Sequence, residues 1–279
     1  MLDSHTAPVP QEKRVILALG GHEFSRRSGN EAIRDYMIDL TEADRPRVCL
    51  LATASGDPDE QIVSFRRSLG ETRAELSQVS LFRLESEPVE LREHLLSQDL
   101  IYVGGGSMVN LLAVWRAHGV DALLREAWQR GTVVVGQSAG AMCWFELGIT
   151  RSSGRPLVAR GLGLVPGLLS VHHSSDPDRR LALGEAVREH RTVALGLDDQ
   201  SGVLIRGHRI AGAISARKGA CVRRVEPLGH GGIRQTLLQS TRLSDPRRAI
   251  NEVDDAVREL RRVRASRSAS AGAGAWSRR

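Results

Sequence analysis

Cysteine and aromatic residues are scarce in this chain of 279 residues. It has three cysteines, and none of them forms a Cys-x-x-Cys pair. We therefore expect neither a disulfide framework nor a zinc knuckle. Aromatic residues make up 4% of the chain and hydrophobic residues 41%. A folded core must therefore consist mostly of Val, Leu, Ile and Ala.

Long apolar segments are also missing. No run approaches the ~20 residues that a membrane-spanning helix needs. The first 13 residues are polar and lack the apolar centre of a secretory signal. Together with the few, isolated cysteines, these absences predict a reduced cytoplasmic protein that does not associate with a membrane.

The positive charge is unevenly distributed. The formal net charge is +6, but the segment from residue 242 to the end holds ten arginines against five acids. The rest of the chain is close to neutral, so we expect no nucleic-acid partner. The basic end either contacts an acidic surface or is a solvated extension, and its composition favours the extension.

Short apolar segments alternate with longer amphipathic ones. This alternation predicts an α/β fold, with a mostly parallel sheet covered by helices on both faces. The predicted strands cover residues 14–19, 48–52, 79–84, 100–103, 132–135, 168–171 and 192–197. The clearest predicted helices cover residues 108–116, 120–130 and 181–190.

We expect one domain, from residue 14 to residue 240, after a flexible lead of residues 1–13. Residues 203–205 and 209–214 flank a turn and predict a terminal hairpin. Residues 241–265 carry apolar residues at helical spacing, which predicts an amphipathic helix that packs on the body or on a second copy in a homodimer. The low-complexity residues 266–279 predict a disordered basic tail.

The most informative segment is residues 133–141, in which a β-branched run leads into Gly-Gln-Ser-Ala-Gly-Ala. This is the pattern of a nucleophile elbow, a sharp strand-to-helix turn that exposes a serine hydroxyl. Gly136 and Gly140 remove side chains where the turn is tightest. The alternative is an ordinary turn of small residues between a strand and a helix. On the elbow interpretation, Ser138 is the candidate nucleophile.

Three consecutive glycines, residues 104–106, follow another predicted strand. Glycines let the backbone approach a ligand and point N–H groups toward it. One of these N–H groups, with that of Ala139, would form an oxyanion hole. The competing interpretation is a phosphate-binding turn. The segment ends in Ser107 and lacks both nucleotide-binding glycine spacings, which disfavours that interpretation.

A serine nucleophile needs a base and a group that orients the base. His172 follows a predicted strand, whereas His190, His208 and His230 lie in charged or turn segments. Asp198 and Asp199 both follow the next strand, where one would orient the histidine and the other would cap a turn. The order Ser, His, Asp differs from that of α/β-hydrolases and counts against that fold.

Taken together, these segments resemble the dipeptidase E and cyanophycinase family of serine peptidases, whose fold is similar to class I glutamine amidotransferases. The similar segments are residues 17–21, 52–57, 101–106, 136–145, 171–180 and 195–199. The resemblance implies that Ser138 is the nucleophile and His172 the base. It also implies oxyanion contacts from Ala139 and Gly105, substrate contacts from the turn at Gly106 and Ser107, and no metal or organic cofactor.

The chain departs from the family pattern at two positions. The family usually has asparagine where this chain has Ser107, and some members have an aspartate where this chain has Ser153. The acid must then come from the pair Asp198 and Asp199, of which we favour Asp199.

Members of this family cleave short peptides, often with an N-terminal aspartate, and some cleave a β-linked aspartyl-arginine polymer. The resemblance therefore predicts a serine exopeptidase for small peptide substrates. Arg179 and Arg180 are candidates for binding a substrate carboxylate, because guanidinium binds carboxylate bidentately. They are also explained as surface charges at the start of a helix. A related hydrolase for another acyl substrate and a catalytically silent binding module remain alternatives, whereas an amidotransferase would need a cysteine nucleophile.

Overall fold

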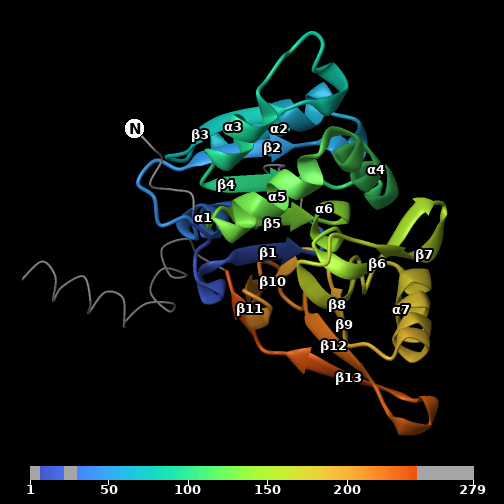
Figure 1. Cartoon of the computed structure of the whole chain (residues 1–279). Helices are drawn as coiled ribbons and strands as arrows, with labels where there is room; N and C mark the ends of the chain where they lie inside the picture. Colours follow the sequence, from blue (N-terminus) through green and yellow to red (C-terminus); the bar gives the residue numbers. More distant parts are fainter. Residues whose placement is uncertain (1–6, 22–29, 244–279) are drawn as a thin grey trace, which may run out of the picture.

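The computed structural model describes residues 7–21 and 30–243. Most of the predicted helix at 241–265 and all of the predicted tail at 266–279 lie outside these residues. The described part contains two β-sheets, which lie side by side with helices packed around them (Figure 1). This architecture confirms the predicted α/β fold, but the strands that we expected in one sheet are divided between two.

The main sheet has eight strands in the order β14-β11-β10-β1-β5-β4-β2-β3. The strands β1, β5, β4, β2 and β3 are mutually parallel, whereas β10 is antiparallel to β1 and β11 to β10. The β10–β11 pair confirms the predicted hairpin. The bounds are β1 (Val15–Leu19), β2 (Arg47–Leu51), β3 (Glu75–Val79), β4 (Leu100–Val103), β5 (Val133–Gln137), β10 (Ser201–Arg206), β11 (Arg209–Ser215) and β14 (Ser240–Arg242).

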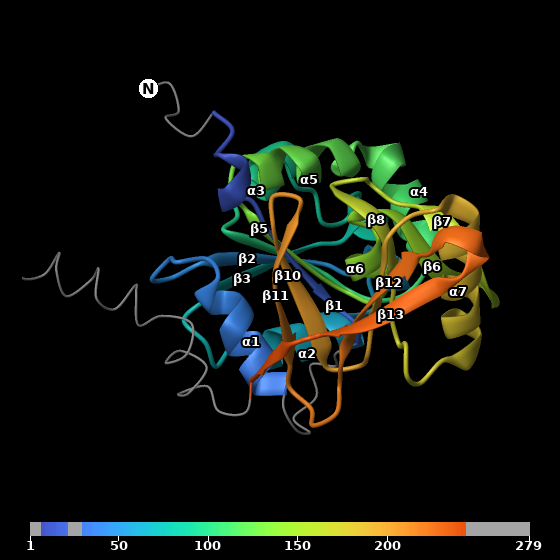
Figure 2. The ribbon, with the colours of Figure 1, turned by 90° about the horizontal axis from the view of Figure 1, so that it is seen from below.

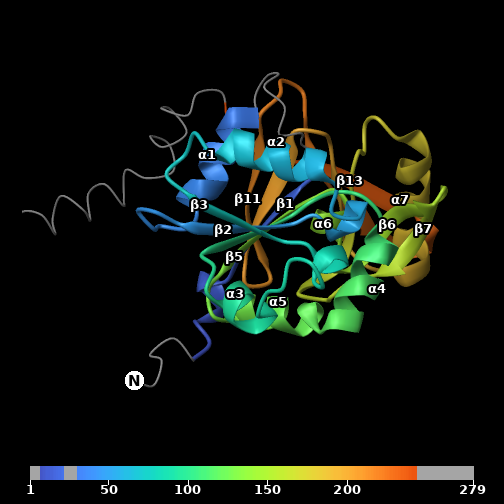
Figure 3. The same ribbon diagram turned by 90° about the horizontal axis from the view of Figure 1, so that it is seen from above.

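Helices cover both faces of the main sheet (Figure 3). In β1, Ile16 and Ala18 belong to one apolar cluster and Leu17 and Leu19 to the other, because successive side chains of a strand point to opposite faces. One face is covered by α1 (Asn30–Asp39) and α2 (Asp59–Leu69), and the other by α3 (Leu91–Leu96), α4 (Met108–His118) and α5 (Val120–Gln129). The short α6 (Ala139–Met142) directly follows β5.

The second sheet has six strands in the order β13-β12-β9-β8-β6-β7, and α7 (Pro177–His190) packs against it (Figure 2). Strand β8 is parallel to β6 and β9, and the remaining pairs are antiparallel. The predicted strands near residues 168 and 194 belong to this sheet. The bounds are β6 (Phe145–Ser153), β7 (Arg155–Arg160), β8 (Val165–Ser170), β9 (Ala194–Leu197), β12 (Val222–Pro227) and β13 (Ile233–Leu238).

One local prediction is wrong. The strand expected at residues 79–84 ends at Val79 and is followed by the 3-10 helix η3 (Leu81–Arg83), because the strand that pairs with β2 is the more polar β3 before it. Part of the lead is fixed to the body. The Val9 N–H donates to the Gln129 carbonyl at 2.8 Å, and η1 (Gln11–Lys13) follows. The other 3-10 helices are η2 (Thr53–Ser55) and η4 (Gly229–Gly231).

No helix within residues 7–21 and 30–243 is both long enough and apolar enough to cross a membrane.

Candidate active site

Ser138 lies on a strained turn between β5 and α6. Its backbone has φ 52° and ψ −114°, values that a non-glycine residue adopts only when its surroundings enforce them. A Cβ atom on Gly136 would collide with the Gly140 carbonyl, and one on Gly140 would collide with the Val103 carbonyl. The two glycines therefore allow the chain to turn sharply enough to present the serine hydroxyl.

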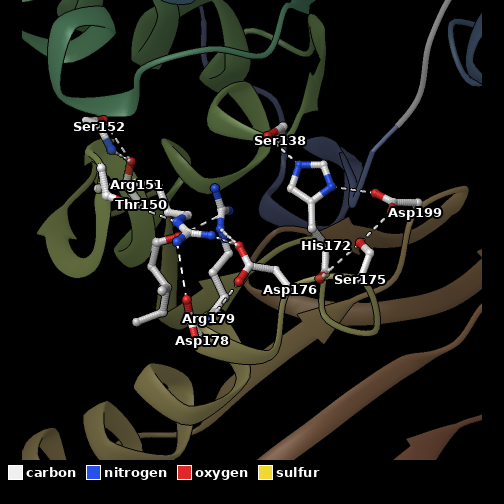
Figure 4. Close-up of polar contacts among 12 residues, drawn as sticks. Ser138, Thr150, Arg151, Ser152, His172, Ser175, Asp176, Asp178, Arg179 and Asp199 are labelled. Carbon is white, nitrogen blue, oxygen red and sulfur yellow. Dashed lines mark hydrogen bonds and ion pairs between the residues drawn. The ribbon is translucent and has the colours of Figure 1, made fainter.

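The Ser138 hydroxyl faces a histidine from the second sheet (Figure 4). Ser138 Oγ lies 3.0 Å from Nε2 of His172, which follows the end of β8. His172 has φ 56°, and its carbonyl accepts hydrogen bonds from the N–H groups of Ser175 and Asp176 at 3.2 and 2.8 Å. In this position, the imidazole can accept the proton of the serine hydroxyl.

The other ring nitrogen of His172 is bound by Asp199. Nδ1 forms a hydrogen bond with Asp199 Oδ1, and Oδ2 of the same carboxylate accepts one from Ser175 Oγ at 2.8 Å. The hydrogen bond with His172 is the main reason that the pKa of Asp199 lies below its usual value. The carboxylate is thus ionised at neutral pH and fixes the orientation of the imidazole.

Asp198 points away from His172. Its buried carboxylate accepts hydrogen bonds from Ser174 Oγ at 2.6 Å, from the Cys221 N–H at 2.9 Å and from Arg223 Nη1 at 2.9 and 3.0 Å. Burial would raise the pKa of Asp198, but these hydrogen bonds and the positive charge of Arg223 lower it below the usual value. Asp198 therefore connects the loop that follows His172, through Ser174, to β12, through Arg223. Only Asp199 of the adjacent pair contacts His172.

The glycine turn after β4 lies beside Ser138. A Cβ atom on Gly105 would come within 3.2 Å of Ser138 Cβ. The N–H groups of Gly105 and Ala139 have no hydrogen-bond acceptor among the described residues. Gly106 has φ 145°, and a Cβ atom there would collide with the Ala54 carbonyl, so this position requires glycine.

Neither serine at the two departures from the family pattern contacts His172. Ser107 is the N-cap of α4, and its Oγ accepts a hydrogen bond from the Asn110 N–H at 3.2 Å. Ser153 is exposed at the end of β6. The capping role of Ser107 explains why serine is favourable at a position that precedes a helix.

The two candidate arginines lie in different environments. Arg179 is buried, and its Nε lies 3.2 Å from Asp176 Oδ2, while Nη1 donates to the Ile149 carbonyl at 3.4 Å. Arg151 Nη1 binds the same Asp176 carboxylate at 3.0 Å. Figure 4 shows this cluster beside Ser138 and His172. Arg180 is exposed and is not part of the cluster.

Burial also affects the charge of this cluster. Burial lowers the pKa of Arg179, and the neighbouring Asp176 opposes the shift. Two guanidinium groups share the carboxylate of Asp176, and Arg151 also reaches the exposed Asp178 at 3.3 Å. The two arginines and the two aspartates of this cluster therefore balance in formal charge, and Arg179 is its buried cation.

Comparison with known proteins identifies the family. The family model of peptidase family S51 matches residues 16–212. The chain belongs to peptidase family S51. It is therefore a serine-type peptidase, as the resemblance predicted. Among the described residues, no group of three His, Cys, Asp or Glu side chains is arranged to hold a metal ion.

One curated relative and two solved structures are similar to this chain. The uncharacterized peptidase YgaJ of Bacillus subtilis (strain 168) is 35% identical over 218 residues, which cover 78% of this chain and 94% of YgaJ. The crystal structure of a peptidase from an acI-B1 Actinobacterium has a TM-score of 0.58 at 18% identity, and the match covers 81% of this chain and 94% of that one. A Listeria monocytogenes EGD-e protein, described provisionally as a peptidase E protein, has a TM-score of 0.51 at 18% identity, with 72% and 98% covered. The two structures share the fold of this S51 peptidase.

Sequence reasoning missed three residues around the S51 site. Ser175 binds the second oxygen of Asp199, and Arg151 and Asp176 surround Arg179. Asp176 is detectable in principle, because an aspartate before a proline is typical of a helix N-cap, and it caps α7. Arg151 has no such signal, since its position depends on how the β6–β7 hairpin packs against α7.

Proposed function

We propose that this S51 peptidase is an exopeptidase that hydrolyses short peptides, in particular dipeptides with an N-terminal aspartate, through Ser138, His172 and Asp199. The observation that carries the proposal is the distance of 3.0 Å between Ser138 Oγ and His172 Nε2, with His172 Nδ1 hydrogen-bonded to Asp199. A silent binding module has no need of this arrangement.

In the proposed reaction, Ser138 Oγ attacks the peptide carbonyl carbon while His172 Nε2 takes the hydroxyl proton. Asp199 stabilises the imidazolium that forms. His172 then gives the proton to the leaving amine, and the C–N bond breaks to leave an acyl ester on Ser138. A water molecule, deprotonated by His172, hydrolyses this ester and regenerates the serine.

The tetrahedral intermediate carries a negative oxygen that requires hydrogen-bond donors. The N–H groups of Gly105 and Ala139 are suitable, because both lie beside Ser138 and neither has an acceptor among the described residues. Such donors contribute about 3 kcal/mol each to transition-state stabilisation. The exposed backbone of Gly106 and the N-cap residue Ser107 lie next along this turn and are proposed to contact the substrate backbone.

Arg179 is the better candidate for binding an acidic side chain. Its guanidinium is buried beside the proposed nucleophile, where its attraction for a carboxylate is less screened by water than at the surface. Arg180 is exposed and outside the cluster, so any contribution from it is weaker. An isoaspartyl peptide carries the same kind of carboxylate, and it is therefore the alternative substrate class.

The test is hydrolysis of a panel of dipeptides and aminoacyl p-nitroanilides by the wild type and by Ser138→Ala. We expect turnover of Asp-X substrates that the variant loses by at least about a thousandfold. Turnover of isoaspartyl peptides alone would favour the alternative. Absence of any Ser138-dependent turnover, combined with no labelling by a fluorophosphonate, would refute the proposal.

Three partner and location predictions accompany this function. We expect a cytoplasmic protein without a nucleic-acid partner. We also expect a homodimer if the apolar stripe of residues 241–265, which lies mostly outside the described residues, packs against a second copy.

A further inference from the structure

Gln137, the residue before Ser138, is held by a buried tyrosine. The Tyr102 hydroxyl of β4 donates a hydrogen bond to Gln137 Oε1 at 2.7 Å. Tyr102 is fully buried and packs on Phe65, with ring centroids 6.1 Å apart. Burial raises the pKa of Tyr102 far above its usual value, so the phenol stays protonated and remains a donor. The hydrogen bond to Oε1 therefore fixes the orientation of the Gln137 carboxamide.

The nitrogen end of this carboxamide remains available. Nε2 lies 3.7 Å from the position that a Cβ atom on Gly105 would occupy. Among the described residues, Nε2 has no hydrogen-bond acceptor, and Gln137 is only half-buried. An oriented amide with two free N–H groups beside a peptidase nucleophile is suited to bind an oxygen of the substrate.

The topology indicates which part of the substrate this amide faces. In the main sheet, β1 and β4 flank β5 on opposite sides. His172 and Asp199 lie against Gly21, just beyond the end of β1, whereas Gln137 leans toward Tyr102 on β4. Because His172 must reach the leaving amine, the leaving group lies on the β1 side. The acyl residue then extends toward β4 and Gln137.

We infer that Gln137 is a specificity-determining residue for the acyl residue, an inference that rests on the proposed peptidase function. Its Nε2 donates to a side-chain oxygen of that residue, either a carboxylate or an amide carbonyl oxygen. A neutral donor does not require a charged acceptor. The site should therefore select asparaginyl as well as aspartyl substrates over leucyl substrates, which have a similar shape but no side-chain oxygen.

The test compares Gln137→Met, Gln137→Glu and wild type on Asp-, Asn- and Leu-p-nitroanilide, which share one leaving group. Methionine keeps the length of the side chain but cannot donate. We expect its kcat/KM to fall about tenfold for Asp and Asn, the usual effect of one lost hydrogen bond, and to change less than twofold for Leu. Glutamate keeps the contact with Tyr102 and adds a negative charge, so Asp turnover should fall further than Asn turnover.

The matched control is Gln235→Met, an exposed position on β13 of the second sheet, which should leave all three rates unchanged. A Gln137→Met enzyme that loses activity equally on Asp, Asn and Leu would overturn the inference, because a merely structural effect does not discriminate between acyl residues. Unchanged kcat/KM of Gln137→Met on all three substrates, with Ser138-dependent turnover in the wild type, would overturn the assignment of Gln137 and leave the proposed function intact. Absence of Ser138-dependent turnover in the wild type would instead refute the proposed function, and the inference with it.

Discussion

His173 lies one residue beyond His172 but points into the core, and it makes the stability of the protein dependent on pH. Its side chain is buried, and within residues 7–21 and 30–243 neither ring nitrogen has a hydrogen-bond partner. Burial, with a smaller contribution from Arg223, lowers the pKa of His173 from 6.5 to about 4. The folded protein thus holds this imidazole in its neutral form.

The sign follows from proton binding. Between pH 6.5 and 4, His173 binds a proton in the unfolded chain but not in the folded chain. The free energy of unfolding therefore falls as the pH falls. With these two pKa values, the loss is negligible at pH 7.5, about 2 kcal/mol at pH 5 and about 3 kcal/mol below pH 4.

The assay is urea unfolding of wild type and His173→Leu between pH 7.5 and 5. Leucine removes the titrating group while keeping a side chain of similar size. Other groups titrate in both proteins, so the difference between their free energies of unfolding isolates His173. This difference should shift by about 2 kcal/mol in favour of the variant on acidification. A difference that stays constant over this range would refute the reasoning and would indicate that His173 is protonated or solvated in the folded state.

Four further predictions test the site and its surroundings. Asp199→Asn should lower kcat by at least about a thousandfold with little change in KM in steady-state assays, because the imidazole loses its orienting anion. Asp198→Asn should instead lower the free energy of unfolding by about 3 kcal/mol in urea titrations, because Arg223 loses its buried partner. Arg179→Met should reduce kcat/KM at least about tenfold for Asp substrates but not for Leu substrates, and an equal loss on both would contradict the proposed role. Deletion of residues 266–279 should leave kcat unchanged, and a large loss would show that the basic tail is required.

The elbow is predictable from sequence because its geometry is encoded locally. The β-branched run favours a strand, and Gly136 and Gly140 are needed wherever the backbone makes this turn. The preference for His172 over the other histidines depends on its position after a strand, which is also a local signal. These features therefore do not require knowledge of the tertiary structure.

The division of the strands between two sheets is not predictable in the same way. Apolar patterning identifies a strand but does not specify its partners. The sequences of β8 and β9 therefore have the same pattern as strands of the main sheet. The sequence also does not determine which of Asp198 and Asp199 contacts His172. The directions of these adjacent side chains depend on the backbone conformation of one turn. The burial of Arg179 depends on the packing of α7 against the β6–β7 hairpin, which joins residues distant in sequence.

The proposed nucleophile and its base are carried by different sheets. Ser138 directly follows a strand of the main sheet, whereas His172 follows a strand of the second sheet. A relative slide of the two sheets by one ångström would lengthen their 3.0 Å contact beyond a hydrogen bond. Catalytic competence should therefore appear only at the last step of folding, when the sheets have docked. During refolding, recovery of activity would then report the docking of the sheets rather than the formation of either sheet alone.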